Sequence, residues 1–151
     1  MLNQSIPDFE LAATSDKQFC SSHYAGKTLV IYFYPKDSTP GCTTEGQQFR
    51  DLYAQFQAAN AEIFGISRDS LKSHENFKTK QCFPFELLSD PEELACNLFG
   101  VMKMKNMYGK QVRGIERSTF VVDANGVLRR EWRGVKVDGH AQQVLDFLKT
   151  L

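Results

Sequence analysis

The sequence predicts an α/β fold in which a mixed central sheet is flanked by helices on both faces. Short apolar runs, typical of buried strands, alternate along the chain with segments whose apolar residues recur at helical spacing. Near the end, two strand-like runs flank a turn that contains Asn125-Gly126, a hairpin signal that adds an antiparallel pair to a partly parallel sheet. At 151 residues the chain is expected to form one domain, residues 1–151.

The strands follow from local patterns. Residues 9–20 predict a small N-terminal β-hairpin, and the apolar run 28–34 predicts a strand buried on both faces. Residues 62–67 and 85–89 are two further short apolar runs, and we expect them to join the same sheet. The final hairpin is expected to span residues 118–132.

Helices should follow the strands. A helix from Cys42 to about Ala59 is expected to pack on the strand at 28–34. Asp69 or Ser70 can cap the next helix, over about 70–81, and Asp90, followed by a proline and two acids, is a strong helix start. The lysine- and methionine-rich residues 103–110 are expected to form a polar loop. Apolar residues at helical spacing mark a C-terminal helix: Ala141, Val144, Leu145 and Leu148.

Composition narrows the classes of function. Eighteen basic and eighteen acidic residues cancel, so the basic excess that a nucleic-acid partner normally needs is absent. The first residues lack the pattern of a secretory signal, and no apolar run approaches the roughly 18 residues of a transmembrane helix. We therefore expect no membrane partner and a cytoplasmic location, in which the four cysteines are free thiols or redox groups.

One of these cysteines is placed for chemistry. The stretch 34–42 joins the buried strand to the following helix, carries two prolines and a glycine, and ends on Cys42 at the helix start. The thiolate is the nucleophilic form of cysteine, and the free N–H groups and dipole at a helix N-terminus favour its negative charge. The alternative is a buried thiol that only packs. A turn built from prolines and glycine fixes where the side chain points, so we interpret Cys42 as reactive.

Other cysteine chemistries fit the sequence poorly. A thioredoxin-type dithiol needs Cys-x-x-Cys, but Glu45 stands at the second position. A cysteine phosphatase needs an arginine soon after the nucleophile, whereas Arg50 lies too far into the helix and Glu45 would repel phosphate. The cysteines also lack the paired spacing of zinc ligands. A cysteine protease needs a histidine partner, but all three are expected to be surface or capping residues: His23, His74 and His140. A cysteine that reacts with a small oxidant is the interpretation left.

The residues around Cys42 resemble a known family. The pattern Pro35-x-x-x-Thr39-x-x-Cys42 resembles the active-site signature of the peroxiredoxins. Similarity to the peroxiredoxin Q, or bacterioferritin comigratory protein, subfamily extends through four segments: 33–43, 85–90, 107–110 and 114–120. The resemblance covers almost the whole chain. It implies a thioredoxin-like fold and a thiol-dependent peroxidase for hydrogen peroxide and organic hydroperoxides that needs no metal, haem or flavin.

The resemblance also implies roles for four residues. Cys42 corresponds to the peroxidatic cysteine, which attacks the O–O bond and becomes sulfenic acid. Arg117 matches the active-site arginine, which would stabilise the thiolate and donate to the peroxide oxygens; by itself it would be interpreted as a solvated charge at a strand edge. Thr39 would hydrogen-bond with peroxide and thiolate, and Pro35 would shield the thiolate from water. Without the resemblance, Thr39 is simply a turn-forming residue and Pro35 a residue that ends the strand.

The sequence departs from the subfamily pattern at the resolving cysteine. Many members carry it five residues after the peroxidatic cysteine, where Gln47 stands, and others on the next helix, at Lys78. Two recycling routes therefore stay open. In the favoured one, an external thiol such as glutathione, glutaredoxin or thioredoxin reduces the Cys42 sulfenic acid directly. In the other, Cys82 at the end of that helix forms a disulfide with Cys42, which thioredoxin then reduces.

The two other thiols are expected to pack, Cys96 in the core and Cys20 at the end of the N-terminal hairpin. A different class of function also stays open, a redox sensor in which oxidised Cys42 changes its contact with a protein partner. Multiple-turnover peroxide consumption would favour the enzyme over the sensor. The subfamily resemblance suggests a monomer.

Overall fold

Seven strands form one mixed sheet at the centre of the computed structural model, which describes all 151 residues. Their order across the sheet is β2-β1-β5-β4-β3-β8-β9. β3, β4 and β5 are parallel neighbours, and every other pairing in the sheet is antiparallel, so the predicted mixed sheet is confirmed. The strands span β1 Glu10–Ala13, β2 Lys17–Cys20, β3 Thr28–Phe33, β4 Ala61–Ser67, β5 Glu86–Ser89, β8 Ser118–Val122 and β9 Leu128–Arg133.

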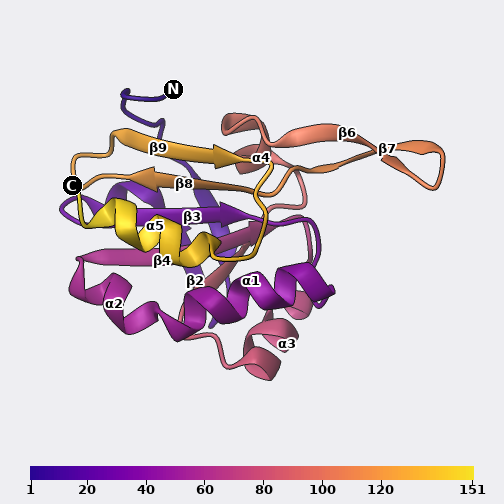
Figure 1. Ribbon diagram of the computed structural model, residues 1–151, viewed down its shortest axis with the longest axis horizontal. Helices are drawn as coiled ribbons and strands as arrows, with labels where there is room; N and C mark the ends of the chain where they lie inside the picture. Colours follow the sequence, from indigo (N-terminus) through magenta and orange to yellow (C-terminus); the bar gives the residue numbers. More distant parts are fainter.

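β3 separates two hydrophobic cores. All of its residues are buried, as predicted. Val30 and Tyr32 face a core closed by α1, α2, α3 and α5, whereas Ile31 and Phe33 face a second core that includes α4. Because side chains alternate across a strand, one apolar run serves both cores. Figure 1 shows α1, α2, α3 and α5 gathered on one side of the sheet. The helices span η1 Ser21–Tyr24, α1 Pro40–Asp51, α2 Tyr53–Ala58, α3 Leu71–Gln81, α4 Leu94–Leu98 and α5 His140–Leu148.

The N-terminal hairpin extends the sheet at one edge, as the sequence predicts. β1 pairs with β2 and also with β5. Ser15 and Asp16 in the connecting turn have φ of 60° and 57°, left-handed values that match the twist of a two-stranded hairpin. Leu11 and Phe19 add their side chains to the core that includes α4.

The first long helix differs from the prediction at both ends. It begins at Pro40, two residues before Cys42, and it ends at Asp51. At Leu52 the backbone (φ −101°, ψ 3°) leaves helical geometry, and the chain continues as α2. Ser70 caps α3 as predicted, because its hydroxyl accepts from the Ser73 N–H at 3.2 Å. None of the helices combines the length and the apolar character needed to cross a membrane.

The helix expected to start at Asp90 begins four residues later, at Leu94. Glu93 adopts a left-handed conformation (φ 62°), which delays the helix. Asp90 still caps it across this turn, because its carboxylate accepts from the N–H of Leu94 at 2.7 Å and of Cys96 at 2.8 Å. Asp90 was therefore correctly predicted as the capping residue, but the helix starts later than predicted.

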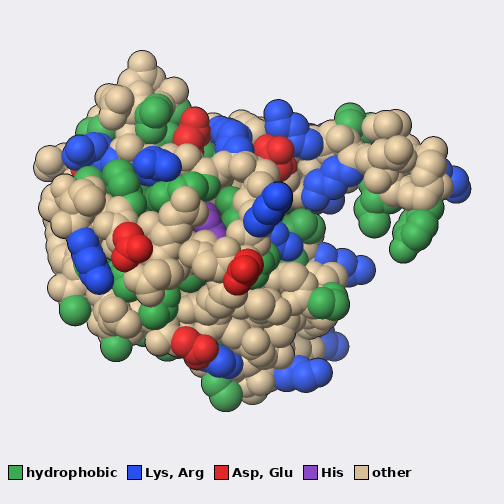
Figure 2. Space-filling model, in the orientation of Figure 1, with side chains coloured by type: hydrophobic (Ala, Val, Ile, Leu, Met, Phe, Trp, Pro, Cys, Tyr) green, Lys and Arg blue, Asp and Glu red, His purple; other side chains and the backbone are tan.

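Residues 103–110 lie in a β-hairpin, so the expected polar loop is wrong. β6 (Met102–Met107) pairs along its length with β7 (Lys110–Ile115), and Tyr108 and Gly109, at φ 53° and 80°, form the turn. The hairpin projects from the body of the protein (Figure 1). Apolar side chains are exposed toward its outer end (Figure 2). Tyr108 in the turn is fully exposed. The lysines obscured the strands because their intrinsic strand propensity is low.

Candidate active site

Cys42 lies in the first turn of α1, beyond the carboxyl end of β3. The turn between these elements covers residues 34–39, with Thr39 as the N-cap and Pro40 as the first helical residue. Proline suits that position because its missing N–H would have no partner there. Cys42 is 2% exposed and belongs to the core closed by α1, α2, α3 and α5. The unpaired N–H groups of the helix start favour negative charge on its sulfur.

Arg117 reaches Cys42 from the segment just before β8. β8 is the antiparallel neighbour of β3, and this pairing brings together residues that are 75 positions apart in the chain. The Arg117 Nη2 donates to the Cys42 Sγ at 3.3 Å, and Nη1 donates to the Glu45 Oε1 at 2.7 Å. A Cβ atom on Gly41 would lie 3.2 Å from Nη2, so this glycine leaves room for the guanidinium against the helix start.

Glu45 is a buried acid in the site that the sequence did not reveal. Its side chain is 1% exposed, and its Oε2 has no hydrogen-bond partner. Burial raises the pKa of Glu45 from 4.5 to about 7, although the Arg117 guanidinium opposes this. Burial lowers the pKa of Arg117, but Glu45 and Cys42 outweigh it and leave that pKa raised. For Glu45, the cost of burying its charge outweighs the attraction to Arg117. Its carboxylate is more deeply buried than the guanidinium, which is 16% exposed.

The buried face of α1 explains how Glu45 reaches the site. Cys42, Glu45, Gly46 and Phe49 are the buried residues of this helix, and they follow the i, i+3, i+4, i+7 spacing of one helix face. An acid on this face, three residues after Cys42, was the signal in the sequence. A Cβ atom on Gly46 would lie 2.3 Å from the ring of Phe83, so the loop after α3 can pack on α1 only at a glycine.

Thr39 and Pro35 lie in the turn before Cys42, and neither forms a hydrogen bond with its sulfur. The Thr39 hydroxyl donates to the backbone carbonyl of Lys36 at 2.8 Å instead of capping α1. Its proton is engaged, so its lone pairs are left to accept. Pro35 is half-buried directly after β3 and Tyr34. The structure thus joins Cys42 directly to Arg117 and places the other two predicted residues in the adjoining turn.

The remaining thiols have contrasting surroundings, and all four cysteines are free. Cys96 is fully buried in the core, as predicted, and burial raises the pKa of this thiol. The packing expected for Cys20 is wrong, because this residue is only partly buried and its thiol donates to Glu10 at 3.2 Å. Cys82 is exposed at the C-cap of α3, where its φ of 55° is the left-handed conformation that glycine usually supplies.

Cys82 lies beside the middle of α1 and away from its first turn. The Gln47 side chain donates to the Gln81 side chain at 2.9 Å, and Arg50 donates to the Gln81 carbonyl at 2.9 Å. Phe83, the residue after Cys82, packs against Gly46. The segment around Cys82 is therefore held against α1 beyond the turn that carries Cys42.

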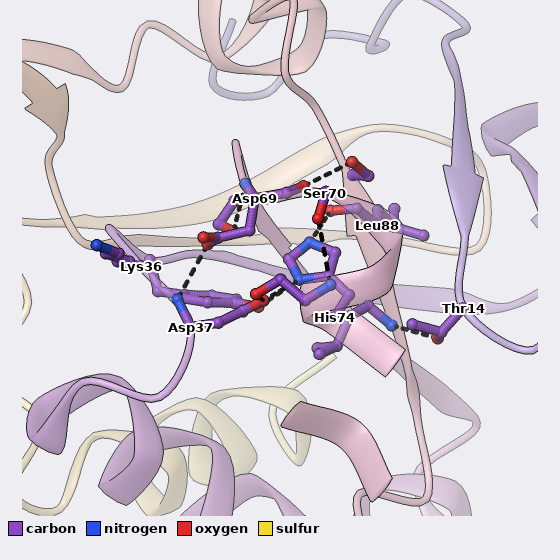
Figure 3. Close-up of polar contacts among 12 residues, drawn as sticks. Thr14, Lys36, Asp37, Asp69, Ser70, His74 and Leu88 are labelled. Carbon is purple, nitrogen blue, oxygen red and sulfur yellow. Dashed lines mark hydrogen bonds and ion pairs between the residues drawn. The ribbon is translucent and has the colours of Figure 1, made fainter. Parts of the chain in front are cut away.

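A buried polar cluster lies behind the turn at 34–39 (Figure 3). Asp37, Asp69 and His74 bring ligand atoms within 4.8 Å of one another, as a metal site would. However, the His74 Nδ1 contacts the Asp37 Oδ2 at 2.6 Å, and its Nε2 contacts the Leu88 carbonyl at 2.9 Å. The Asp69 carboxylate accepts from the Asp37 N–H at 3.0 Å and from the Ser67 hydroxyl. The protein itself satisfies these atoms, so we interpret the cluster as a hydrogen-bond network.

Two of the three histidines are buried, which contradicts the expected surface or capping positions. His74 is 0% exposed and His140 is 3% exposed, and only His23 lies at the surface. The His140 Nε2 bonds with the Thr119 hydroxyl at 2.8 Å, and burial lowers the pKa of His140 to about 4. A single histidine creates no apolar periodicity in the sequence. Its burial could not be predicted, because it depends on partners that only the fold brings together. No histidine forms a hydrogen bond with Cys42, which agrees with the exclusion of a Cys–His pair.

The family model for the AhpC/TSA family matches residues 2–131. The chain belongs to this family. Peroxiredoxin Bcp of Xanthomonas campestris is 56% identical over 142 residues, which cover 94% of this chain and 89% of that protein. Peroxiredoxin Bcp of Bacillus subtilis is 46% identical over 150 residues, which cover 99% and 96%.

Solved structures of the family share the fold. Xanthomonas campestris bacterioferritin comigratory protein superposes with a TM-score of 0.90 at 54% identity, covering 94% of this chain and 90% of that one. A mutant of Xylella fastidiosa PrxQ superposes with a TM-score of 0.95 at 43% identity, covering 99% and 96%. The predicted thioredoxin-like fold is confirmed. The protein is a peroxiredoxin of the Bcp, or PrxQ, group, and so a thiol-dependent peroxidase.

Proposed function

We propose that Cys42 is the peroxidatic cysteine of this peroxiredoxin. The observation that supports this is the Arg117 Nη2, which lies 3.3 Å from the Cys42 Sγ at the start of α1. The thiolate attacks one peroxide oxygen and displaces the other as the O–O bond breaks. The sulfur becomes a sulfenic acid, and the displaced hydroxide or alkoxide takes up a proton and leaves as water or an alcohol.

Arg117 contributes a fixed positive charge at the reacting sulfur. A guanidinium stays protonated at every physiological pH, and this one is 16% exposed, so water screens its charge only weakly. It stabilises the thiolate before the attack and donates to the peroxide oxygens during it. The second bond of the guanidinium, to Glu45 at 2.7 Å, holds the group in place.

Thr39 and Pro35 shape the space in which the peroxide binds. Because the Thr39 hydroxyl donates to the Lys36 carbonyl, it acts as an acceptor for the O–H of a hydroperoxide. Pro35 has no N–H and is half-buried in the turn before Cys42, where its ring would limit the access of water to the thiolate. Together with Arg117, these groups orient the O–O bond for in-line attack.

We favour recycling of the Cys42 sulfenic acid by an external thiol: glutathione, glutaredoxin or thioredoxin. For Cys82 to reach disulfide distance, the first turn of α1 would have to unwind and Phe83 would have to leave its contact with Gly46. The external route needs only access to the sulfur. The incoming thiolate attacks the Cys42 sulfur to form a mixed disulfide, and the sulfenic oxygen takes up a proton and leaves as water. A second external thiolate then attacks the mixed disulfide and releases the Cys42 thiolate. In the alternative route, Cys82 attacks the sulfenic acid in place of the first external thiol, and thioredoxin reduces the internal disulfide.

We also propose that organic hydroperoxides are substrates alongside hydrogen peroxide, and that the enzyme works as a cytoplasmic monomer. The Xanthomonas campestris relative is described by its alkyl peroxide reduction activity, which supports the first point. The free state of all four cysteines fits a reducing compartment. The monomer rests on the subfamily resemblance.

Replacing Cys42 by serine tests the assignment. We expect Cys42→Ser to lose peroxide consumption with every thiol donor, and retained turnover would refute the proposal. Mass spectrometry after one equivalent of peroxide then separates the recycling routes in the wild-type protein. A gain of one oxygen indicates a lasting sulfenic acid, whereas a loss of two hydrogens indicates an internal disulfide.

A further inference from the structure

Asp37 is a buried residue that fixes the turn leading to Cys42 to the body of the protein. It is the one buried residue between Tyr34 and Cys42, at 6% exposure. Pro35 and Thr39 are half-buried. The other residues of the stretch are exposed: Lys36, Ser38, Pro40 and Gly41. A turn aspartate is normally solvated, so an inward carboxylate has to be held by donors.

Two hydroxyl groups donate to this carboxylate, and the ring of His74 pairs with it. The Tyr34 hydroxyl donates to the Asp37 Oδ1 at 2.6 Å. The Ser73 hydroxyl lies 2.8 Å and the His74 Nδ1 lies 2.6 Å from Oδ2. Ser73 and His74 belong to α3, so the carboxylate bonds the turn to a neighbouring helix (Figure 3).

His74 is a rigid partner because both of its ring nitrogens are used. Its Nε2 faces the carbonyl oxygen of Leu88 at 2.9 Å, and a carbonyl can only accept, so Nε2 carries a hydrogen. Leu88 lies in β5, and His74 therefore links the turn to the central sheet as well as to α3. The side chains of His74 and Asp37 are 0% and 2% exposed. Neither side chain can exchange its partner for water. Removing His74 leaves the Asp37 Oδ2 with only the Ser73 hydroxyl, and removing Asp37 takes away the 2.6 Å partner of the His74 Nδ1.

The position of the Thr39 hydroxyl depends on Asp37. The hydroxyl donates to the carbonyl of Lys36, which belongs to the peptide that leads into Asp37. Ser38 has a φ of 63°, so the chain reverses tightly between Asp37 and Thr39. A rotation at Asp37 would move the carbonyl that orients the Thr39 hydroxyl. Thus a group on the wall of the peroxide pocket is held from α3.

We propose that Asp37 and His74 are positioning residues for peroxide attack at Cys42 and act through the Thr39 turn. The proposal rests on the peroxide-binding role proposed for Thr39. The pair does not touch the peroxide. It holds the turn so that the Thr39 hydroxyl accepts from the peroxide along the line of attack, and a displacement of about 1 Å is enough to slow an oriented reaction about 100-fold.

Two reactions of the same sulfur provide the test. Peroxide attack needs the oriented pocket, whereas alkylation by iodoacetamide needs only an accessible thiolate. Both second-order rate constants are measured on one protein at one pH, with modification of Cys42 followed by mass spectrometry. We expect His74→Gln to slow oxidation by hydrogen peroxide about 10–100-fold and to change alkylation by less than about twofold. A role confined to stability would leave the ratio of the two rates unchanged.

Thr14→Val is the matched control. The Thr14 hydroxyl is buried and accepts from the N–H of Leu87, next to Leu88 in β5, at 3.0 Å. The hydroxyl also donates to the Glu86 carboxylate at 3.0 Å, so the substitution removes two hydrogen bonds near the network without touching the turn. It should lower stability and leave both rate constants within about twofold of wild type. Ser73→Ala serves where His74→Gln does not fold. It removes one donor from Asp37, and we expect several-fold slower oxidation with unchanged alkylation.

Thr39→Ala separates this proposal from the function on which it rests. In the Thr39→Ala background, His74→Gln should slow oxidation no further, because the group that it positions is gone. Slow oxidation in Thr39→Ala with a wild-type rate in His74→Gln overturns the positioning role alone. An equal slowing of oxidation and alkylation in His74→Gln also overturns it. A wild-type rate in Thr39→Ala overturns the peroxide-binding role of Thr39 and this proposal with it, and leaves the roles of Cys42 and Arg117 standing.

Discussion

Glu45 should make the stability of this protein depend on pH, and a neutral substitution should remove that dependence. Burial raises the pKa of Glu45 from 4.5 to about 7 in the folded protein. A raised pKa means that the folded state favours the protonated carboxyl, so its contribution to stability is complete below pH 4.5 and is lost as the pH rises through 7. The difference between the two pKa values corresponds to about 3 kcal/mol of unfolding free energy.

Glu45→Gln keeps the shape of the side chain and the neutral state of the protonated acid. Urea unfolding at pH 5, 6, 7 and 8, with reducing agent present, yields the unfolding free energies of both proteins. We expect the wild type to lose about 2–3 kcal/mol relative to the variant between pH 5 and pH 8. Comparison with the variant cancels the titration of other groups. Glu92→Gln, at an exposed glutamate, is the matched control and should show no pH-dependent difference from wild type.

The sign of the result tests the reasoning. If the difference between wild type and Glu45→Gln is constant with pH, burial and the Arg117 ion pair balance, and Glu45 does not titrate in this range. If the wild type gains stability relative to the variant as the pH rises, the attraction between Glu45 and Arg117, at 2.7 Å, outweighs the loss of hydration. Either outcome would refute the claim that burial decides the protonation of Glu45.

Three further predictions concern single substitutions. Arg117→Ala should slow peroxide reduction about 100–1,000-fold in stopped-flow assays, and a wild-type rate would contradict the role of Arg117. Circular dichroism should still show a folded protein, because without Arg117 the pKa of Glu45 rises further and its buried carboxyl becomes neutral. Gly46→Ala should destabilise by about 1–3 kcal/mol in urea unfolding, because the new Cβ meets the Phe83 ring at 2.3 Å; the stabilisation of about 0.5–1 kcal/mol usual for this change in a helix would contradict that contact. Cys82→Ser should leave turnover with an external thiol unchanged, and a loss of turnover together with an internal disulfide in the wild type would contradict the favoured recycling route.

The elements that the sequence predicted correctly are those that depend on short-range patterns. β3 is an unbroken apolar run, the N-terminal hairpin has turn residues between two short strands, and Ser70 stands directly before the helix that it caps. Periodicity and capping act over a few residues, so they can be recognised in a single chain. The errors occur where local preference is weak or misleading. The lysines of β6 disfavour a strand, and Glu93 in a left-handed conformation moves the start of α4.

The site residues also divide into those that the sequence predicted and those that only the structure revealed. Cys42, Thr39 and Pro35 lie within one short stretch, and the resemblance placed Arg117 with them before any fold was known. Glu45 had a signal in its place on the buried face of α1, three residues after Cys42, but its partner Arg117 is distant in the chain. His74 had no such pattern, and only its buried partner Asp37 distinguishes it from a solvated side chain.

The sequence by itself determined that a thiol stands at the start of a helix after a buried strand, because strand, turn and helix start are all encoded within about 30 residues of Cys42. The tertiary structure alone decided what surrounds that thiol. The pairing of β3 with β8 brings Arg117 to the sulfur, the buried face of α1 adds Glu45, and the packing of α3 adds His74 behind the turn. Such contacts join residues that are far apart in the chain, and burial determines both the protonation of these groups and the strength of their interactions.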